Sequence, residues 1–284
     1  MHRVRTGRGG HGVVGFHGWS GDHTTFDPLI QKLPEAVSFY SFDLPGCGKS
    51  SKPKVWEIRS VARSIAEEVA ALGKEKVTLV GSCTGGLMAL FVARELLEMG
   101  RGGVVGRLVM IDPFAVCPWY FRIFLTPLLG PLMYGVTFAN PLGRWITDLF
   151  LKERRGSSVS LTESFVRVDH RVSLATLRMF ERAGEPEQFR GMDIPVEIIQ
   201  GEKTFTGVKQ AVERWRGVWP EMSVHILAGV GHLPIEEASE AVRKIVFQGL
   251  GERKTAKKSR MSSQAARELR ELRNELTRGD SVGS

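Results

Sequence analysis

The fold of this chain is decided by the stretch Val77-Thr78-Leu79-Val80-Gly81-Ser82-Cys83-Thr84-Gly85-Gly86. Aliphatic and β-branched residues lead into glycines and small residues, and an apolar run follows. This order is typical of a strand that enters a tight turn and leaves it as a buried helix. The residue at the apex of such a turn needs small neighbours two positions away on each side, because the backbones pass close together. Gly81 and Gly85 flank Cys83 in this way and no such pair flanks Ser82, so we predict that Cys83 is the apex residue.

Three further motifs accompany this turn. The first is His17-Gly18-Trp19, which follows the apolar run 13–16, and the second is the loop Asp43-Leu44-Pro45-Gly46-Cys47-Gly48-Lys49-Ser50. The third is Gly229-Val230-Gly231-His232, near the carboxyl end. With the apex sequence G-x-C-x-G, these motifs make residues 10–248 resemble the α/β-hydrolase superfamily, whose strand–turn–helix is called the nucleophile elbow. The resemblance implies an α/β-hydrolase fold into which a helical cap is inserted.

The hydrophobic pattern alternates between strands and helices, which predicts a mostly parallel, doubly wound sheet. We expect strands at 13–16, 37–42, 77–80, 105–111, 196–200 and 224–227. We expect helices at 27–33, 58–72, 86–99, 208–215 and 235–250. About a dozen residues precede the first of these strands, so the opening hairpin of the resembled fold should be shortened.

The pattern breaks between 114 and 151, where Arg122, Arg144 and Asp148 are the charged residues. The charge-free run 123–143 is long enough to span a bilayer. Six prolines and glycines interrupt it, however, which favours a helical cap over a membrane span. Shallow docking of this cap on a membrane surface is left open. We therefore divide the chain into a core (1–113), a cap (114–190), a second core part (191–250) and a basic tail with a short helix (251–284).

Composition and charge narrow the class of protein. The 284 residues carry a net charge of +8, and the stretch 252–280 has nine Lys or Arg against five Asp or Glu. No basic-aromatic motif accompanies this charge, so we expect no specific nucleic-acid binding. Three cysteines without framework spacing, and no apolar leader after Met1, predict free thiols in the cytoplasm. Membrane contact through the cap or the basic tail is left open, and no cofactor or metal is expected.

Cys83 is the candidate nucleophile. A buried, inert cysteine is the alternative, but an elbow lifts one side chain out at the top of the sheet. A nearby helix amino terminus and a histidine lower a cysteine pKa from about 8.5 to roughly 3.5–7.5, which favours the thiolate. The resemblance assigns the general base to His232 and a structural role to His17. It also nominates the backbone N–H groups of Trp19 and Thr84 for the oxyanion hole.

The acid of a catalytic triad is missing from its usual place. The resembled family commonly carries it as G-x-x-D after the strand that follows the cap, and Thr204 occupies that position here. Threonine cannot hold a histidinium by charge. Some members carry the acid at the end of the strand after the elbow helix instead, and Asp112 stands there. We predict Asp112 as the residue that orients His232, against the alternative of an ordinary strand-end aspartate.

These assignments predict an enzyme that hydrolyses an ester or thioester with an apolar acyl part through a Cys83 acyl-enzyme. Its partner would be a small-molecule substrate. The alternatives are an acyltransferase, a non-catalytic binding protein with a degenerate triad, and an interaction protein tethered by its tail. We also expect the cap to line an apolar acyl pocket above Cys83, through the residues Trp119, Tyr120, Phe121, Ile123, Phe124, Leu125, Leu128, Leu129, Met133, Tyr134 and Phe138.

Overall fold

The sheet is the centre of the computed structural model, which describes residues 1–154 and 160–250. Seven strands in these residues pair in the order β1-β3-β2-β4-β5-β6-β7. Only β1 runs antiparallel to its neighbour, and the other strands are parallel. The strands are β1 (Arg3–Thr6), β2 (His11–Phe16), β3 (Val37–Phe42), β4 (Val77–Ser82), β5 (Val105–Ile111), β6 (Val196–Gly201) and β7 (Ser223–Leu227). The α/β-hydrolase fold predicted from the motifs is confirmed.

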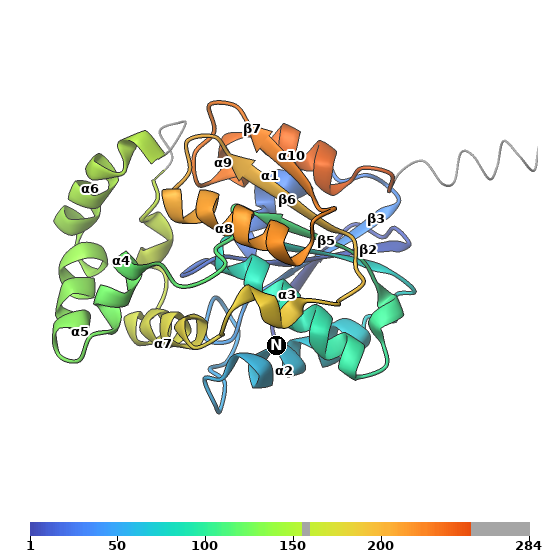
Figure 1. Cartoon of the computed structure of the whole chain (residues 1–284), viewed down its shortest axis with the longest axis horizontal. Helices are drawn as coiled ribbons and strands as arrows, with labels where there is room; N and C mark the ends of the chain where they lie inside the picture. The colour runs from blue at the N-terminus through green and yellow to red at the C-terminus, as the bar shows by residue number, and fades with distance from the viewer. Residues whose placement is uncertain (155–159, 251–284) are drawn as a thin grey trace, which may run out of the picture.

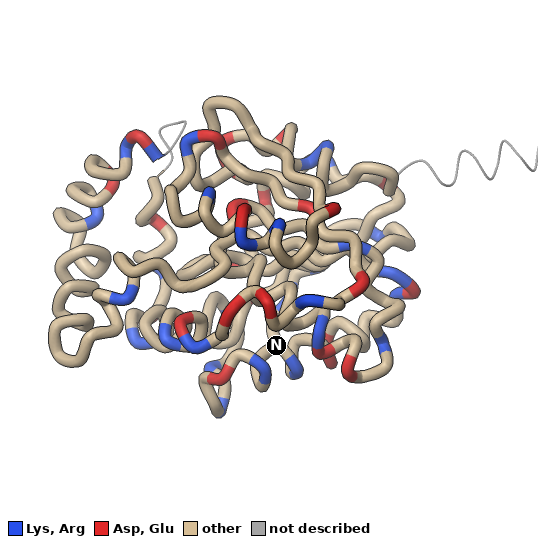
Figure 2. The backbone as a smooth tube through the Cα atoms, in the orientation of Figure 1, with Lys and Arg blue, Asp and Glu red and all other residues tan. Residues whose placement is uncertain are grey.

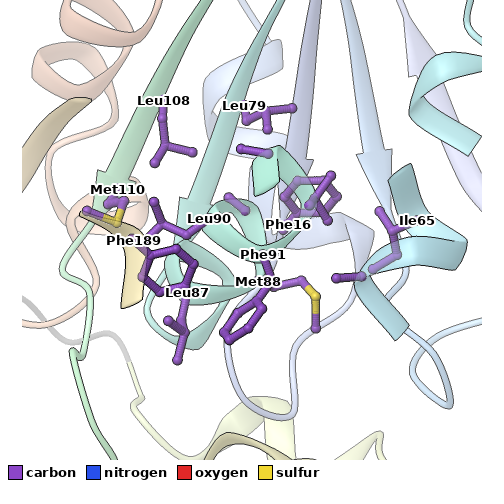
Figure 3. Close-up of a cluster of buried hydrophobic side chains, with 14 of the residues drawn as sticks. Phe16, Ile65, Leu79, Leu87, Met88, Leu90, Phe91, Leu108, Met110 and Phe189 are labelled. Atoms are coloured by element: carbon purple, nitrogen blue, oxygen red, sulfur yellow. The ribbon is translucent and has the colours of Figure 1, made fainter. Parts of the chain in front are cut away.

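Helices cover both faces of this sheet. They are α1 (Asp27–Ile30), α2 (Ile58–Ala70), α3 (Thr84–Glu98), α8 (Thr206–Val218), α9 (Pro234–Glu237) and α10 (Ser239–Val246). Successive strand residues point to opposite faces, so neighbours such as Leu79 and Val80 belong to two separate hydrophobic clusters. Leu79 packs with α2, α3 and α8, in the cluster that Figure 3 shows in part, and Val80 packs with α1, α9 and α10. The sheet is therefore buried on both sides, as a parallel sheet requires.

The segment between β5 and β6 forms a group of helices at one side of the sheet (Figure 1). It contains α4 (Trp119–Arg122), α5 (Leu129–Tyr134), α6 (Pro141–Phe150) and α7 (His170–Glu181), with a π-helical turn at Gly135–Ala139. Within the described ranges, no single helix is long and apolar enough to cross a membrane. One pair, Trp119–Leu125 with Leu129–Ala139, passes by length and composition but is bent by 111°. The helical insertion thus lies where the sequence pattern broke.

Two parts of the core differ from the sequence prediction. The strand β1 was not expected, because RVRT carries two charges in four residues. It pairs with β3, and the guanidinium groups of Arg3 and Arg5 lie over the rings of Phe42 and Tyr40, at 5.9 and 5.7 Å from the centroids. These cation–π contacts stabilise the two arginines in the strand, although the charges of this segment do not predict a strand from the sequence.

The helix expected at 235–250 is broken. Ala238, with φ −143° and ψ 45°, separates α9 from α10. The carboxylate of Glu237, the last residue of α9, accepts the N–H groups of Gly231 (2.7 Å) and Leu233 (3.2 Å). Both N–H groups flank His232, so the short helix α9 fixes the loop that carries the histidine. The basic tail and its expected helix lie outside the described residues.

Candidate active site

Cys83 lies at a strained turn between β4 and α3. Its φ of 53° and ψ of −120° are unusual for a residue with a side chain. A Cβ added to Gly81 would lie 2.2 Å from the carbonyl oxygen of Gly85, and one added to Gly85 would lie 2.1 Å from that of Phe16. The two glycines therefore let the backbones pass, as the sequence argument required. The result is a half-exposed cysteine at the amino terminus of a buried helix.

The turn that follows β2 lies directly against this cysteine. A Cβ on Gly18 would be 3.0 Å from the Cβ and 3.7 Å from the Sγ of Cys83. His17 fixes the turn, because its Nδ1–H donates to the Gly18 oxygen (2.8 Å) and its Nε2 accepts from the N–H of Leu44 (2.9 Å). Burial lowers the pKa of His17, so the neutral form that these bonds need is favoured. The structure thus brings the Gly18–Trp19 turn and the start of α3 together at Cys83.

Asp112 follows β5 and is fully buried, with a φ of 50°. Its Oδ2 accepts a hydrogen bond from Nδ1 of His232 at 2.7 Å. Its Oδ1 accepts the N–H of Gly201 at 2.8 Å. The structure therefore brings together Asp112 and His232, which are 120 residues apart in the sequence. A carboxylate on Nδ1 holds an imidazole in one orientation and stabilises its charged form.

Thr204 lies beside this carboxylate and does not replace it. Its hydroxyl donates to Oδ2 of Asp112, and its Oγ1 is 3.2 Å from Nδ1 of His232. The threonine is fully buried, so these are its partners in place of water. The position at which the family's usual acid was expected therefore supplies a hydrogen bond to the acid on the neighbouring strand. Sequence reasoning did not find this role, because it depends on the pairing of β5 with β6.

The imidazole of His232 is enclosed by two aromatic rings. Phe114 and Phe205 lie 5.6 and 4.8 Å from it, centroid to centroid. Burial lowers the pKa of His232, but hydrogen bonds to Asp112 and Cys83, and the charges of both groups, outweigh it and raise that pKa to about 10. These contacts favour the protonated form of the imidazole.

Arg154 ties the cap segment to the histidine loop. Its carbonyl oxygen accepts the N–H of His232 at 2.9 Å, and its guanidinium donates to the carbonyl oxygen of Thr204 at 3.3 Å. This contact could not be predicted from the sequence, because it joins residues that are far apart in the chain. It makes the position of His232 dependent on the end of α6 and the turn after it.

Two neighbouring cavities lie between the core and the start of the cap segment, and one of them reaches the elbow. A small one of about 20 Å³ reaches Thr84 and is otherwise enclosed mainly by apolar side chains, among them Leu87, Phe114, Phe121 and Leu177. A groove of about 410 Å³ between α4 and α8 shares Val116–Pro118 with it. Among the described residues, the buried hydroxyls of Thr84 and Tyr120 have no hydrogen-bond partner. These hydroxyls are polar groups that a bound substrate could satisfy.

The expectation that the whole cap segment lines a pocket is wrong in part. Trp119, Leu128 and Leu129 are exposed by 81%, 94% and 48%. Phe124, Tyr134 and Phe138 are buried, but they pack edge-on or tilted around the indole of Trp19. Only Phe121 of the expected set lines the small cavity, and Trp119 and Tyr120 line the groove. Periodicity cannot distinguish a side chain that packs from one that faces a cavity.

One cluster in the described residues has the composition of a metal site. Nitrogen and oxygen atoms of His2, His23 and Asp43 lie within 4.8 Å of one another. However, the oxygens of Asp43 already accept the backbone N–H groups of His23 (2.7 Å) and Lys49 (2.9 Å). Each histidine Nδ1 also bonds to the same carboxylate, at 2.6 and 2.8 Å. We assign this cluster to holding the Asp43–Ser50 loop in place.

Comparison with known proteins identifies relatives of this chain. A soluble epoxide hydrolase of Corynebacterium sp. is 25% identical over 244 residues, which are 81% of this chain and 77% of that protein. A 2-hydroxy-6-oxononadienedioate/2-hydroxy-6-oxononatrienedioate hydrolase of Comamonas testosteroni is 24% identical over 84% of this chain and 85% of its own length. These relatives are hydrolases, which supports a hydrolase at the level of the family.

Solved structures give the same fold. The structure of Cfl2 from Burkholderia cenocepacia superposes with a TM-score of 0.70 at 20% identity, covering 86% of this chain and 90% of that one. The sequence profile of the alpha/beta hydrolase family matches residues 13–245. This match covers most of the sequence, and Cys83, Asp112, Thr204 and His232 lie within it. The chain therefore belongs to the alpha/beta hydrolase family.

Proposed function

We propose that this protein is a hydrolase of esters or thioesters that works through an acyl-enzyme on Cys83. The observation that carries the proposal is the hydrogen bond from His232 to the buried carboxylate of Asp112, at an elbow whose apex residue is a cysteine. A protonated imidazole next to a thiol favours the thiolate, which is the nucleophilic form.

In the acylation step, the Sγ of Cys83 attacks the carbonyl carbon and a carbon–sulfur bond forms. The carbonyl oxygen gains negative charge, which the backbone N–H groups of Trp19 and Thr84 stabilise. Losing one such donor costs about 3–4 kcal/mol of transition-state stabilisation. When the tetrahedral intermediate collapses, the bond to the alkoxide or thiolate leaving group breaks, and His232 gives that group its proton. The product of this step is a thioester on Cys83.

In the deacylation step, neutral His232 takes a proton from water as the water oxygen attacks the thioester. The carbon–sulfur bond breaks, a carboxylic acid leaves, and Cys83 and His232 return to the charged pair. Asp112 holds Nδ1 throughout, so that Nε2 stays directed to the reacting atoms. An acyltransferase would differ only here, because an acceptor other than water would attack.

The two cavities suit two different parts of the substrate, its acyl group and its leaving group. We place an apolar acyl group in the small cavity and the leaving group in the groove between α4 and α8. A volume of about 20 Å³ has room for roughly one water-sized group, so the acyl group is short unless the cap moves. The groove is bordered by Arg122, Gln210 and Arg214, which suits a polar leaving group.

Turnover of p-nitrophenyl acetate and of an acetyl thioester tests this proposal. We expect Cys83→Ala to abolish turnover and Cys83→Ser to impair it severely, because serine ionises far less readily and needs the full base and acid system. Val55→Ala, in an exposed loop, is the matched control and should leave the rate unchanged. Equal rates for wild type and Cys83→Ala would reject the nucleophile. Products that form only with an added alcohol or amine acceptor would favour the transferase.

A further inference from the structure

The helix α6 exposes its apolar side to solvent. Its apolar residues fall on one helical stripe and are all exposed: Leu142 (64%), Trp145 (64%), Ile146 (39%), Leu149 (54%) and Phe150 (82%). Its polar residues Arg144, Thr147 and Asp148 are half-buried against the protein. A surface helix of a soluble domain normally has the opposite arrangement, with the apolar stripe toward the core.

Specific contacts hold α6 in this orientation. Arg144 donates from Nη1 to the carbonyl oxygen of Phe138 at 3.1 Å. Asp148 accepts from Ser160 Oγ (2.5 Å), the N–H of Leu161 (3.1 Å) and the hydroxyl of Thr162 (3.1 Å). The polar side is therefore committed to the protein, and a rotation that buried the apolar stripe would break these bonds.

The preceding helix presents the same kind of face. Leu128, Leu129, Leu132 and Val136 are exposed by 94%, 48%, 63% and 56%, while the opposite side of this segment packs on Trp19. Eleven of the sixteen exposed large apolar side chains in the described ranges fall between 119 and 150. We call this surface the outer cap face; its members are Trp119, Ile123, Leu128, Leu129, Leu132, Val136, Leu142, Trp145, Ile146, Leu149 and Phe150.

The segment that carries the outer cap face has a net positive charge: residues 114–154 contain Arg122, Arg144, Lys152 and Arg154 against Asp148 and Glu153. Arg122 lies within the range 119–150 of this face and Lys152 just after it, and both are exposed. Arg122 is 3.9 Å from Glu181, and Glu153 follows Lys152. Figure 2 shows few other charges along α5 and α6. Asp148 is the only carboxylate between 114 and 152, and its oxygens are occupied by the contacts described above. Apolar side chains bordered by cations, with two exposed tryptophans among them, match the interface of a bilayer that contains anionic lipids.

We propose that the outer cap face docks in the plane of an anionic bilayer surface. The bend of 111° between the two apolar helical pieces, and the lack of a spanning helix in the described residues, favour lying in the interface over crossing it. A water-exposed apolar area of this extent is a binding surface in soluble proteins. Self-association through the same face is the alternative, and the experiment below distinguishes it from lipid binding. This inference does not depend on the proposed hydrolase activity.

Vesicle sedimentation of the full chain tests the docking surface. The vesicles contain phosphatidylcholine with roughly one-third phosphatidylglycerol, and vesicles of phosphatidylcholine alone are the comparison. The test variant is Trp145→Glu/Leu149→Glu, and the matched control is Val55→Glu/Ile226→Glu, whose side chains are exposed by 60% and 62% at other places. Thermal unfolding of each variant shows that the fold is kept.

We expect wild type and control to sediment with the anionic vesicles, and the test variant to bind at least about tenfold more weakly. Binding to phosphatidylcholine alone should be weaker for wild type. Three results would overturn the proposal: wild type that stays in the supernatant, a folded test variant that binds as well as wild type, or a wild-type dimer that the test variant dissociates without any vesicle binding. The second result would assign membrane contact to another part of the chain, such as the basic tail.

Discussion

Cys83 differs from the other two cysteines in its surroundings, since Cys47 and Cys117 are buried and Cys83 is half-exposed. Burial raises the pKa of Cys47 to about 12 and that of Cys117 to about 11. The charges of Asp43 and Asp22 raise the pKa of Cys47 further, whereas Cys83 is hydrogen-bonded to the imidazole of His232. Of the three cysteines, Cys83 is therefore the one that we expect to react as a nucleophile.

Iodoacetamide at about pH 7 should label Cys83 at least roughly tenfold faster than Cys47 or Cys117, because the thiolate is the reactive form. Peptide mapping by mass spectrometry measures the three rates in one sample. His232→Gln should slow the labelling of Cys83 and leave the other two unchanged. Equal rates at the three cysteines would argue against a catalytic thiolate.

The acid of the site is predicted to be Asp112, with Thr204 as its hydrogen-bond donor. Asp112→Asn should reduce turnover by roughly a hundredfold or more, since His232 would lose the group that holds its charged form. Thr204→Asp should give no gain, because a second carboxylate would face Asp112 in a buried place. Thr204→Ser, which keeps the hydroxyl, is the control. Steady-state kinetics of the three variants decide the matter, and a neutral Asp112→Asn with a faster Thr204→Asp would remove Asp112 from the site.

The sequence predicts those parts of the site that lie within one short motif. It does not predict the contacts between segments that are distant in the chain. The glycines around Cys83 place the apex of the turn from the residues alone, whereas the role of His232 followed from the resemblance carried by the motif Gly229-Val230-Gly231-His232. The prediction of Asp112 came from the resemblance to the α/β-hydrolase superfamily, whose members carry the acid at one of two positions. The support from Thr204 and Arg154 could not be predicted, because each contact joins segments that only the folded sheet and cap bring together.

Among the elements, β5 and the loop after β7 are linked by the bond between Asp112 and His232. Because the pKa of His232 is raised to about 10 from an unfolded value near 6.5, this charge stabilises the folded state. The contribution is fully present below about pH 6.5 and is lost as the pH rises through about 10.

The free energy of unfolding of wild type minus that of His232→Gln should therefore be largest near about pH 6 and shrink toward about pH 10. Urea unfolding at several pH values measures this difference. The same comparison in an Asp112→Asn background should show a weaker pH dependence, because the raised pKa depends on that carboxylate. A difference that stays constant or grows with pH would contradict the assignment.

Element boundaries were predicted well where the pattern is strong, as at Val37–Phe42 and Val105–Ile111. The stripe Leu142, Trp145, Ile146, Leu149 and Phe150 could equally be recognised as amphipathic. Which side of that helix faces the protein could not be predicted, because contacts of Arg144 and Asp148 with other segments decide it. For the same reason, the apolar pattern of the cap predicts residues that line a pocket, although many of them face solvent in the structure.

For the whole molecule, the two cavities predict the shape of the substrate. At a fixed leaving group, kcat/KM should rise by up to a few-fold per added methylene and stop rising after about one or two, because the small cavity is then full. Leu177→Ala enlarges that cavity and should extend the rise to longer acyl groups. Gln210→Ala, in the groove, is the matched control for the acyl series. A rise that continues to dodecanoyl in wild type would show that the acyl chain lies elsewhere or that the cap opens.

The central claim is that Cys83 forms a covalent acyl-enzyme. Intact-mass analysis after acid quench, within the first turnovers of an activated acetyl ester, tests it most directly. The account predicts a mass increase of one acetyl group in place of one hydrogen, mapped to the peptide that contains Cys83 and absent from Cys83→Ala. His232→Gln should retain the acetyl group longer, because deacylation needs the base. Turnover by wild type without any acyl group on Cys83, or the same adduct in Cys83→Ala, would contradict the account.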